Sequence, residues 1–276
     1  MSHAENAIAR LRRDLTLSML IRWGLVAAVL AALALEAAGV IPVSGSLVLA
    51  LIGGLWLFLS YRSMHGSRMV AESPQLIAAG LYERAEQHID QAIRSFSLFR
   101  NVKLRTLHHL AVLRHAQQRW SEAALLSQAL LRERLGPLAG LSRSARLILA
   151  DALLEIGDLR GAHQALMSLY QQRLGLSEAL ELTAVQTDYL ARIGAWPQLT
   201  EGLRRKLELA ELMPPERSAR VQAQLALAAK KTGHEAGESF LRRRAELLAD
   251  VRDLVVRRPM LAELWQAGPI EQKQVE

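Results

Sequence analysis

The chain of 276 residues contains no cysteine, and aromatic residues make up only 5% of it. The lack of cysteine excludes disulfides, thiolate metal ligands and a cysteine nucleophile. Hydrophobic residues nevertheless make up 51% of the sequence, so its apolar content is mainly Ala and Leu, which are strong helix formers. Gly-Pro and Asn-Gly turns are few, and β-branched runs are rare. We therefore predict an all-α fold.

Motifs that carry chemistry are also missing. The sequence has no Gly-x-x-x-x-Gly-Lys-Ser/Thr loop, no Gly-x-Gly-x-x-Gly turn and no His-Glu-x-x-His pair, which bind phosphates, dinucleotides and zinc. The string GLSRSA at 140–145 lacks the preceding strand that a nucleophile elbow needs. We expect no catalytic residues, no metal, no cofactor and no enzymatic activity.

Basic residues outnumber acidic ones, which gives a net charge of +7. The basic runs at 204–206, 242–244 and 257–258 are not interleaved with aromatic side chains. They therefore provide no stacking platform for bases, and we expect no nucleic-acid partner. Such runs either face water at helix ends, where they favour the helix dipole, or bind anionic lipid headgroups.

Two long apolar segments lie near the N-terminus. Residues 23–41 read WGLVAAVLAALALEAAGVI and residues 43–61 read VSGSLVLALIGGLWLFLSY, 19 residues each. A helix of about 20 apolar residues spans the hydrocarbon core of a bilayer, and it satisfies its own backbone hydrogen bonds there. Pro42, Ser44 and Gly45 form a short break between the segments. We predict a transmembrane helical hairpin at 23–61.

The flanks of these segments predict their orientation. Basic residues precede the first segment and follow the second, whereas the connection between them carries no Lys or Arg. Because basic flanks stay on the cytoplasmic side, we expect a multi-pass inner-membrane protein with both termini in the cytoplasm. The basic residues are Arg10, Arg12, Arg13 and Arg22 before the hairpin, and Arg62 and Arg68 after it.

A cleaved signal peptide is the alternative for the first segment, because small residues suited to cleavage occur in ALALEAAG. However, the segment exceeds the apolar part of usual signal peptides, about 7–15 residues, and a second segment follows at once. In the cytoplasmic segment 1–22, Ile8, Leu11, Leu15 and Met19 recur at helical spacing beside arginines. This pattern predicts an amphipathic helix that lies on the membrane surface.

Glu36 lies within the first apolar segment. A charged carboxylate at the centre of a bilayer costs about 2.5–3.5 kcal/mol on insertion scales. Glu36 is displaced toward the connection, where it is either solvated or makes an intramembrane contact with a partner helix. Small residues four apart, such as Ala27 and Ala31, would let a neighbouring helix approach closely. The Gly53–Gly54 pair of the second segment is the simplest partner.

A second pattern follows the apolar segments and repeats along the chain. The strings GLYERA, QRWSEA, GDLRGA and GAWPQL succeed one another at steps of 38, 39 and 37 residues. A period in this range is typical of stacked helix pairs, in which neighbouring pairs bury a continuous core. We predict such an array for residues 62–265, closed by residues 250–265 and followed by a tail at 266–276. The strings end at Ala85, Ala123, Ala162 and Leu199.

Over roughly residues 75–250 the chain resembles the tetratricopeptide repeat. The third unit matches best, with RSARLILADALLEIG as its first helix and DLRGAHQALMSLYQQ as its second. The match weakens at both ends: the helix before Gly80 is short and interrupted by Pro74, and Leu199 replaces an alanine in the fourth unit. The resemblance implies an antiparallel helical-repeat solenoid, anchored in the membrane as in some bacterial members of the family.

The resemblance also implies a partner-binding surface on the concave wall, which the first helices line. This wall would be polar and of mixed charge, although such residues can also simply face solvent. The family's peptide clamp of asparagines and lysines is not supported, since the chain has only two asparagines. The pattern gives the partner-binding residues Arg105, His108, His109, His115, Asp151, Glu155, Asp188, Arg192, Arg220, Gln224, Lys230 and Lys231.

Together these features predict a membrane-anchored scaffold of the tetratricopeptide type, which binds protein partners at the cytoplasmic face of the inner membrane. Its partners would be proteins, the lipid bilayer and, through basic helix ends, anionic lipid headgroups. The alternative is an accessory subunit of a membrane complex that acts through its transmembrane helices and Glu36.

Overall fold

The computed structural model describes residues 3–38, 45–136 and 138–265. Every regular element in these ranges is helical, which confirms the all-α prediction. The chain divides into two compact units, residues 1–152 (unit 1) and 153–276 (unit 2). Within the described ranges, side chains are not described at 35–37, 45–49, 62, 64–69 and 139.

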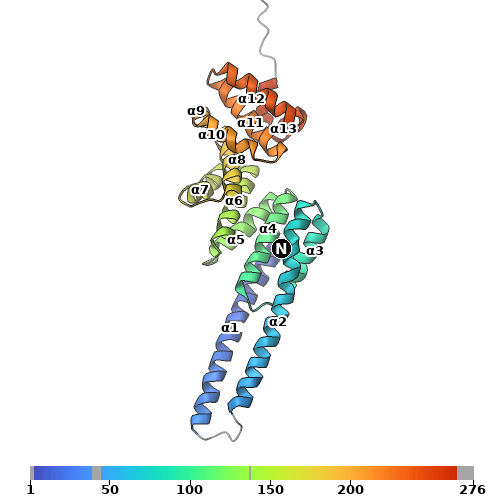
Figure 1. The fold of residues 1–276 in the computed structure, drawn as a ribbon, viewed down its shortest axis with the longest axis vertical. Coiled ribbons are helices and arrows are strands. Elements are labelled where there is room, and N and C mark those ends of the chain that lie inside the picture. Colours follow the sequence, from blue (N-terminus) through green and yellow to red (C-terminus); the bar gives the residue numbers. More distant parts are fainter. Residues whose placement is uncertain (1–2, 39–44, 137, 266–276) are drawn as a thin grey trace, which may run out of the picture. The chain divides into compact units, whose positions relative to one another are not determined.

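Two long helices, α1 (His3–Ala37) and α2 (Gly45–Ala78), open unit 1 and lie side by side in Figure 1. The prediction of a short helix interrupted at Pro74 is wrong, because α2 continues through Pro74 to its end. One helix therefore carries both the second apolar segment and the start of the predicted repeat region. Of the predicted break, Pro42 and Ser44 lie outside the described residues, whereas Gly45 is the first residue of α2.

The helices after α2 alternate between two lengths. The longer helices have 17 residues each and are α4 (Arg100–Ala116), α6 (Ala139–Glu155), α8 (Leu176–Arg192) and α11 (Pro215–Lys231). The shorter helices have 12 to 14 residues and are α3 (Tyr82–Arg94), α5 (Trp120–Arg132), α7 (Leu159–Tyr170) and α12 (Glu235–Leu248). After α8 the short helix is divided into α9 (Trp196–Thr200) and α10 (Leu203–Glu211). The helix boundaries thus follow the period that the sequence predicted.

Each turn before a short helix contains one residue in the left-handed backbone region. Gly80, Gly157, Gly194 and Gly233 have φ of +74°, +83°, +70° and +77°. Gln118 takes the equivalent position in the second turn, with φ of 60°. Glycine adopts this conformation without strain, whereas a side chain raises its energy by roughly 1–2 kcal/mol. The left-handed conformation therefore recurs at the same position of each turn, even where that position is not a glycine.

Each unit has its own hydrophobic core. In unit 1, α1, α3, α4 and α5 contribute buried Leu, Ile and Ala side chains, among them Leu11, Ile89, Leu107 and Leu126. In unit 2, α11 is the central helix, and almost all of its residues from Ser218 to Ala229 are buried. The last elements, α13 (Val251–Arg257), η1 (Pro259–Leu261) and α14 (Ala262–Trp265), add Leu254, Leu261 and Leu264 to that core. This closing segment therefore packs with the α11–α12 pair.

Candidate functional site

The first apolar segment lies on α1, and its large side chains face outward. Trp23 is 65% exposed and Leu30 is 62% exposed. By length and composition, His3–Ala34 is the one helix among the described residues that could cross a membrane, and 6% of its apolar window is buried. Such low burial distinguishes this stretch from the core helix of a globular domain. An exposed apolar surface of this kind marks a membrane or partner contact.

The second apolar segment lies on α2, where the described apolar stretch Ala50–Tyr61 is shorter than a membrane span. Its outward side chains include Leu57, at 69% exposure. A Cβ atom added at Gly53 or Gly54 would meet nothing within 4 Å, and the same holds at Gly24 of α1. The predicted packing of small residues between the two segments is therefore not found at these glycines. The side chains of Glu36, Arg62 and Arg68 lie outside the described residues.

The first five turns of α1 are built into unit 1. Ala4, Ala7, Leu11, Asp14 and Ser18 are all buried and follow one another at alternating steps of three and four residues. This spacing puts them on one helical face, which packs on α3, α4 and α5. The apolar face that we expected on the membrane surface is thus covered by the chain's own helices, except for Met19, which is 62% exposed.

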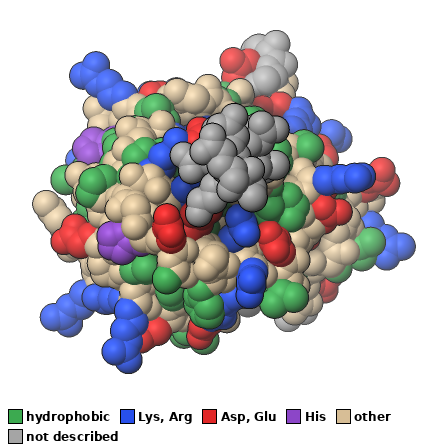
Figure 2. Space-filling view, turned by 90° about the horizontal axis from the view of Figure 1, so that it is seen from above, with side chains coloured by type: hydrophobic (Ala, Val, Ile, Leu, Met, Phe, Trp, Pro, Cys, Tyr) green, Lys and Arg blue, Asp and Glu red, His purple; other side chains and the backbone are tan. Residues whose placement is uncertain are grey.

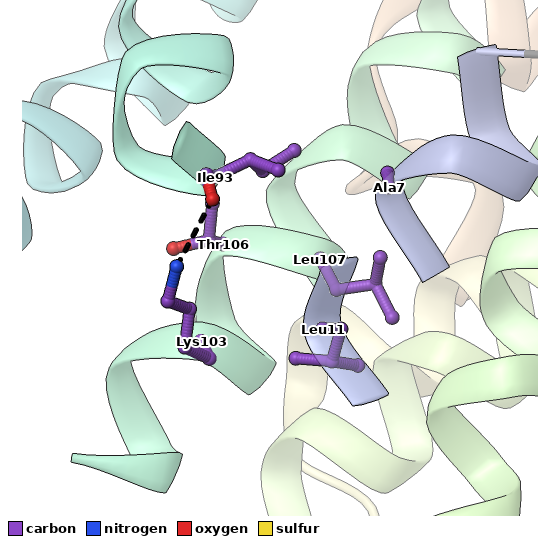
Figure 3. Close-up of a pocket in the computed structure, with 6 residues that line it drawn as sticks. All are labelled: Ala7, Leu11, Ile93, Lys103, Thr106 and Leu107. Atoms are coloured by element: carbon purple, nitrogen blue, oxygen red, sulfur yellow. Dashed lines mark hydrogen bonds between the residues drawn. The ribbon is translucent and has the colours of Figure 1, made fainter. Parts of the chain in front are cut away.

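A buried ion pair holds the middle of this segment. The Lys103 ammonium lies 2.6 Å from Asp14 Oδ2, and the two side chains are only 3% and 9% exposed. Lys103 also donates to the carbonyl of Ile93 at 3.0 Å, at the end of α3 (Figure 3). The cavity beside it holds about 10 Å³, room for at most one water molecule. The pair therefore joins helices, and this cavity is too small to bind a ligand.

A second cluster holds the start of α1. The Arg114 guanidinium, which is fully buried, donates to Glu86 Oε1 at 2.6 Å and lies 3.1 Å from Glu122 Oε2. It also contacts His3 Nδ1 at 3.0 Å, and His3 Nε2 lies 3.1 Å from Asp90 Oδ1. The hydrogen bond from Arg114 lowers the pKa of Glu86. Because Arg114 is fully buried, the loss of its carboxylate partners would leave an uncompensated buried charge.

The partner-binding residues predicted in unit 1 mostly bond to neighbouring helices. His115 Nε2 lies 2.8 Å from Asp151 Oδ2, and His108 Nε2 lies 2.9 Å from Ser144 Oγ. His109 contacts a backbone carbonyl of α2 through Nδ1. Burial lowers the pKa of His108 to about 4, and burial also lowers the pKa of His109. Both rings are therefore neutral at physiological pH.

The partner-binding residues predicted in unit 2 form a closed ionic network. Asp188 accepts hydrogen bonds from Gln224 Nε2 at 2.5 Å, Arg258 Nε at 2.8 Å and Arg192 Nε at 3.1 Å. Glu155 accepts from Arg258 Nη1 at 3.3 Å and from Arg192 Nη2 at 3.5 Å. Asp188 and Gln224 are fully buried. These two side chains therefore do not face solvent in this structure.

Arg258 completes this network and was missed from the sequence. Burial lowers the pKa of Arg258, but the carboxylates of Asp188 and Glu155 outweigh burial and raise it overall. The guanidinium is thus permanently charged in a site that is almost closed to solvent. Two carboxylates and two guanidinium groups balance there, which makes the network a structural clamp.

The other predicted wall residues differ in exposure. Arg105 is exposed and Arg220 is half-buried. Lys230 donates to the carbonyl of Glu263 at 2.5 Å, and Lys231 pairs with the carboxylate of the same residue. Two of the remaining candidates thus tie α11 to α14. Partner binding through this set stays a prediction, and Arg105, Lys230 and Lys231 are its exposed members.

The described part of the chain shows no cluster of metal ligands. No group of three or more His, Asp and Glu side chains within it could hold a metal ion. On the face drawn in Figure 2, basic, acidic and hydrophobic side chains are interspersed. Comparison with models of known protein families, with curated proteins and with solved structures gives no match for this chain. Its function must therefore be inferred from its own geometry.

Proposed function

We propose that this chain is a membrane-anchored helical-repeat scaffold, which crosses the inner membrane twice through α1 and α2 and holds protein partners at the cytoplasmic face. One observation carries the proposal: α1 is a single helix whose first half is locked into a polar helical unit and whose second half exposes apolar side chains. An anchor and a docking body thus share one continuous element.

The contacts of α1 support two crossings. His3 and Asp14 bond to Arg114 and Lys103 of α4, so the start of α1 lies on the same side of a membrane as α4. If the apolar half of α1 crosses a bilayer, the chain must cross again before it reaches α3 and α4. The exposed apolar stretch of α2 is the segment available for that return.

The same contacts argue against cleavage of the first segment. Removal of α1 would take from Lys103 its carboxylate partner, Asp14. It would also expose to water the apolar side chains of α3, α4 and α5 on which α1 packs, and that exposure is unfavourable. Residues 1–22 therefore act as part of the folded unit.

The repeat pattern supports a tetratricopeptide-like solenoid. Long helices of 17 residues alternate with short helices, and a left-handed turn residue recurs before the short helix in each of five turns. Arrays of this kind present extended surfaces to partners. A bilayer anchor adds to this by turning a weak contact into an effectively intramolecular one.

The topology is tested with single thiols, since the native chain has none. Glu83→Cys and Arg160→Cys are both exposed positions, one in each unit. In sealed inverted membrane vesicles, a membrane-impermeant maleimide should label both thiols without detergent, because inverted vesicles expose the cytoplasmic face. Labelling that requires detergent at either position would refute the cytoplasmic orientation.

The docking function is tested by purification of the tagged full chain in mild detergent. We expect specific co-purifying proteins, and we expect Arg105→Glu to reduce their recovery while Arg160→Glu does not. Arg105 is an exposed member of the predicted wall, and Arg160 is an exposed arginine of α7 outside it. If neither the wild-type chain nor any variant recovers a partner, the scaffold proposal fails.

Glycines of α1 and α2 with free space beside them favour a second candidate function. In this alternative the chain is an accessory subunit that acts through its membrane helices. Gly24, Gly53 and Gly54 have no neighbour where a Cβ would lie, and glycine faces allow close approach of another helix. Glu36→Gln separates the two functions. Loss of activity with intact partner recovery would favour the accessory subunit over the scaffold.

A further inference from the structure

The loop between α3 and α4, residues 95–99 with the sequence SFSLF, contacts both long helices where they leave unit 1. Arg22 of α1 donates a hydrogen bond from Nη2 to the carbonyl of Leu98. Ser63 of α2 shares a hydrogen bond with the hydroxyl of Ser97. The loop therefore lies beside the points at which the exposed apolar stretches of α1 and α2 begin.

Exposed aromatic side chains lie next to the residues of α1 and α2 that contact this loop. Trp23 follows Arg22 directly and is 65% exposed, and Tyr61 lies two residues before Ser63 and is 77% exposed. Trp and Tyr favour the interface between hydrocarbon and water. Phe96 and Phe99 of the loop are half-buried, so both residues are partly accessible from outside.

Helix direction brings further arginines to this end of unit 1. Lys103, near the start of α4, bonds to Asp14 and to the end of α3, whereas Arg114, near the end of α4, bonds to His3. These contacts make α4 antiparallel to α1. Arg100 at the start of α4 reaches Glu133 after the end of α5, at 2.8 Å. The start of α4 and the ends of α3 and α5 therefore surround the loop.

Among the described residues at this end, basic side chains outnumber acidic ones. Of the arginines there, only Arg100 has a carboxylate partner among the described residues, and that partner is Glu133. At the other end of the same helices, Arg114 and Arg119 pair with Glu86 and Glu122. The arginines beside the loop are Arg22, Arg94, Arg100, Arg132 and Arg134.

We infer that this arginine collar, formed by Arg22, Arg94, Arg100, Arg132 and Arg134 around the α3–α4 loop, binds the headgroups of anionic phospholipids. Guanidinium groups match phosphate oxygens in pairs of hydrogen bonds, and basic clusters beside a membrane span attract anionic lipids. The inference rests on the proposed anchoring through α1 and α2. It adds a third membrane contact, which holds unit 1 against the bilayer in addition to the two helices.

The test uses the full chain with a single thiol at Phe96→Cys, labelled with a polarity-sensitive dye. The control thiol is Glu83→Cys, which is exposed at the opposite end of α3. Both proteins are placed in vesicles of phosphatidylcholine alone or mixed with phosphatidylglycerol, with a quencher attached to the lipid headgroup. We expect quenching at position 96 to be roughly twofold or more above that at 83, and greatest with phosphatidylglycerol.

Charge variants identify the arginines responsible. Arg94→Gln/Arg132→Gln/Arg134→Gln should roughly halve the number of phosphatidylglycerol molecules that the unlabelled protein retains in native mass spectrometry. The matched control is Arg160→Gln/Arg205→Gln/Arg243→Gln, three exposed arginines of unit 2, which should retain the wild-type number. This second measurement does not depend on the folding of the labelled protein.

The outcomes separate this inference from the anchor itself. Equal quenching at positions 96 and 83, or equal lipid retention by the two triple variants, refutes lipid binding by the arginine collar. If the same chain still floats with vesicles, the proposed membrane anchor stands. Inorganic phosphate is also added to phosphatidylcholine vesicles that lack phosphatidylglycerol. If it raises the quenching at position 96 as much as phosphatidylglycerol does, the site binds free phosphate and the lipid inference is wrong. A chain that does not float with vesicles at all refutes the anchor and the collar together.

Discussion

His109 donates a hydrogen bond from Nδ1 to the carbonyl oxygen of Val70, at 3.1 Å. Val70 lies four residues before Pro74 in α2, so its oxygen is the one that proline deprives of a helical partner. A side chain of α4 therefore replaces the missing backbone donor. This contact explains how α2 passes through Pro74 without ending, and it joins α2 to α4.

The first prediction concerns this replacement. His109→Leu should destabilise the full chain by about 1–3 kcal/mol, because the buried carbonyl of Val70 loses its donor. In a Pro74→Ala background the same substitution should have a clearly smaller effect, since the alanine supplies the helical N–H that proline lacks. Urea unfolding of the four proteins in mild detergent gives the coupling energy. A coupling near zero would show that His109 does not compensate for the proline.

The second prediction concerns the pH dependence of unit 1. Burial lowers the pKa of His108 from 6.5 to about 4, so the folded unit binds this proton less readily than the unfolded chain. The contribution is fully present above pH 6.5 and is lost as the pH falls toward 4. Over that range stability should fall by an amount on the order of 3 kcal/mol from this histidine.

The comparison protein for this effect is His108→Gln, which cannot titrate but can still bond to the hydroxyl of Ser144. Its unfolding free energy should depend less steeply on pH than that of the wild-type chain between pH 6.5 and 4. Parallel curves for the two proteins would assign the acid sensitivity to other groups.

The third prediction concerns the turn at Gln118. This residue has φ of 60° where the equivalent turns have glycine, so Gln118→Gly should remove backbone strain of roughly 1 kcal/mol. Part of that gain is offset because glycine also loses more conformational entropy on folding. We therefore expect a rise in melting temperature of a few degrees for the full chain.

The opposite substitution in the next turn serves as its control. Gly157 has φ of +83°, and a Cβ there would meet nothing within 4 Å. Gly157→Ala should therefore destabilise through backbone strain alone. If both substitutions change stability in the same direction, the repeated left-handed turn does not control the fold in the way we describe.

The helical class and the repeat period could be predicted because they depend on local patterns. Alanine and leucine recur at helical spacing, and the buried residues Ala85, Ala123, Ala162 and Leu199 keep the period of the turns. The continuity of α2 could not be predicted, because it depends on His109, which is 35 residues beyond Pro74. Proline signals a break unless a distant donor replaces its N–H.

The candidate wall was only partly predictable for a related reason. The repeat period aligns polar residues of successive long helices, and aligned residues pair: His115 with Asp151 and Asp188 with Gln224 are each 36 positions apart. Sequence spacing identified the helical face but not whether that face was solvent-exposed. Arg114 did carry a signal, because it follows Leu107 and Leu110 on a buried helical face. Arg258 carried none, since it lies 70 residues from Asp188.

The last prediction concerns the network that Arg258 closes. Arg258→Met should destabilise unit 2 by about 3–5 kcal/mol, because it strands the buried carboxylate of Asp188 with too few donors. Arg258→Lys should fall between this variant and the wild type, since an ammonium keeps the charge but cannot bond to Asp188 and Glu155 in the same geometry.

The neighbouring arginine is the matched control for this prediction. Arg257 is mostly exposed and lies 3.8 Å from the exposed Glu216, so Arg257→Met should change stability by less than about 1 kcal/mol. Thermal unfolding followed by circular dichroism, on full chains in the same detergent, compares the three variants. Because the clamp ties α13 to α8, Arg258→Met should also expose the segment after α12 to limited proteolysis before the rest of unit 2 unfolds. Equal melting temperatures and equal proteolysis for the Arg258 and Arg257 variants would show that the clamp contributes no more than a surface ion pair.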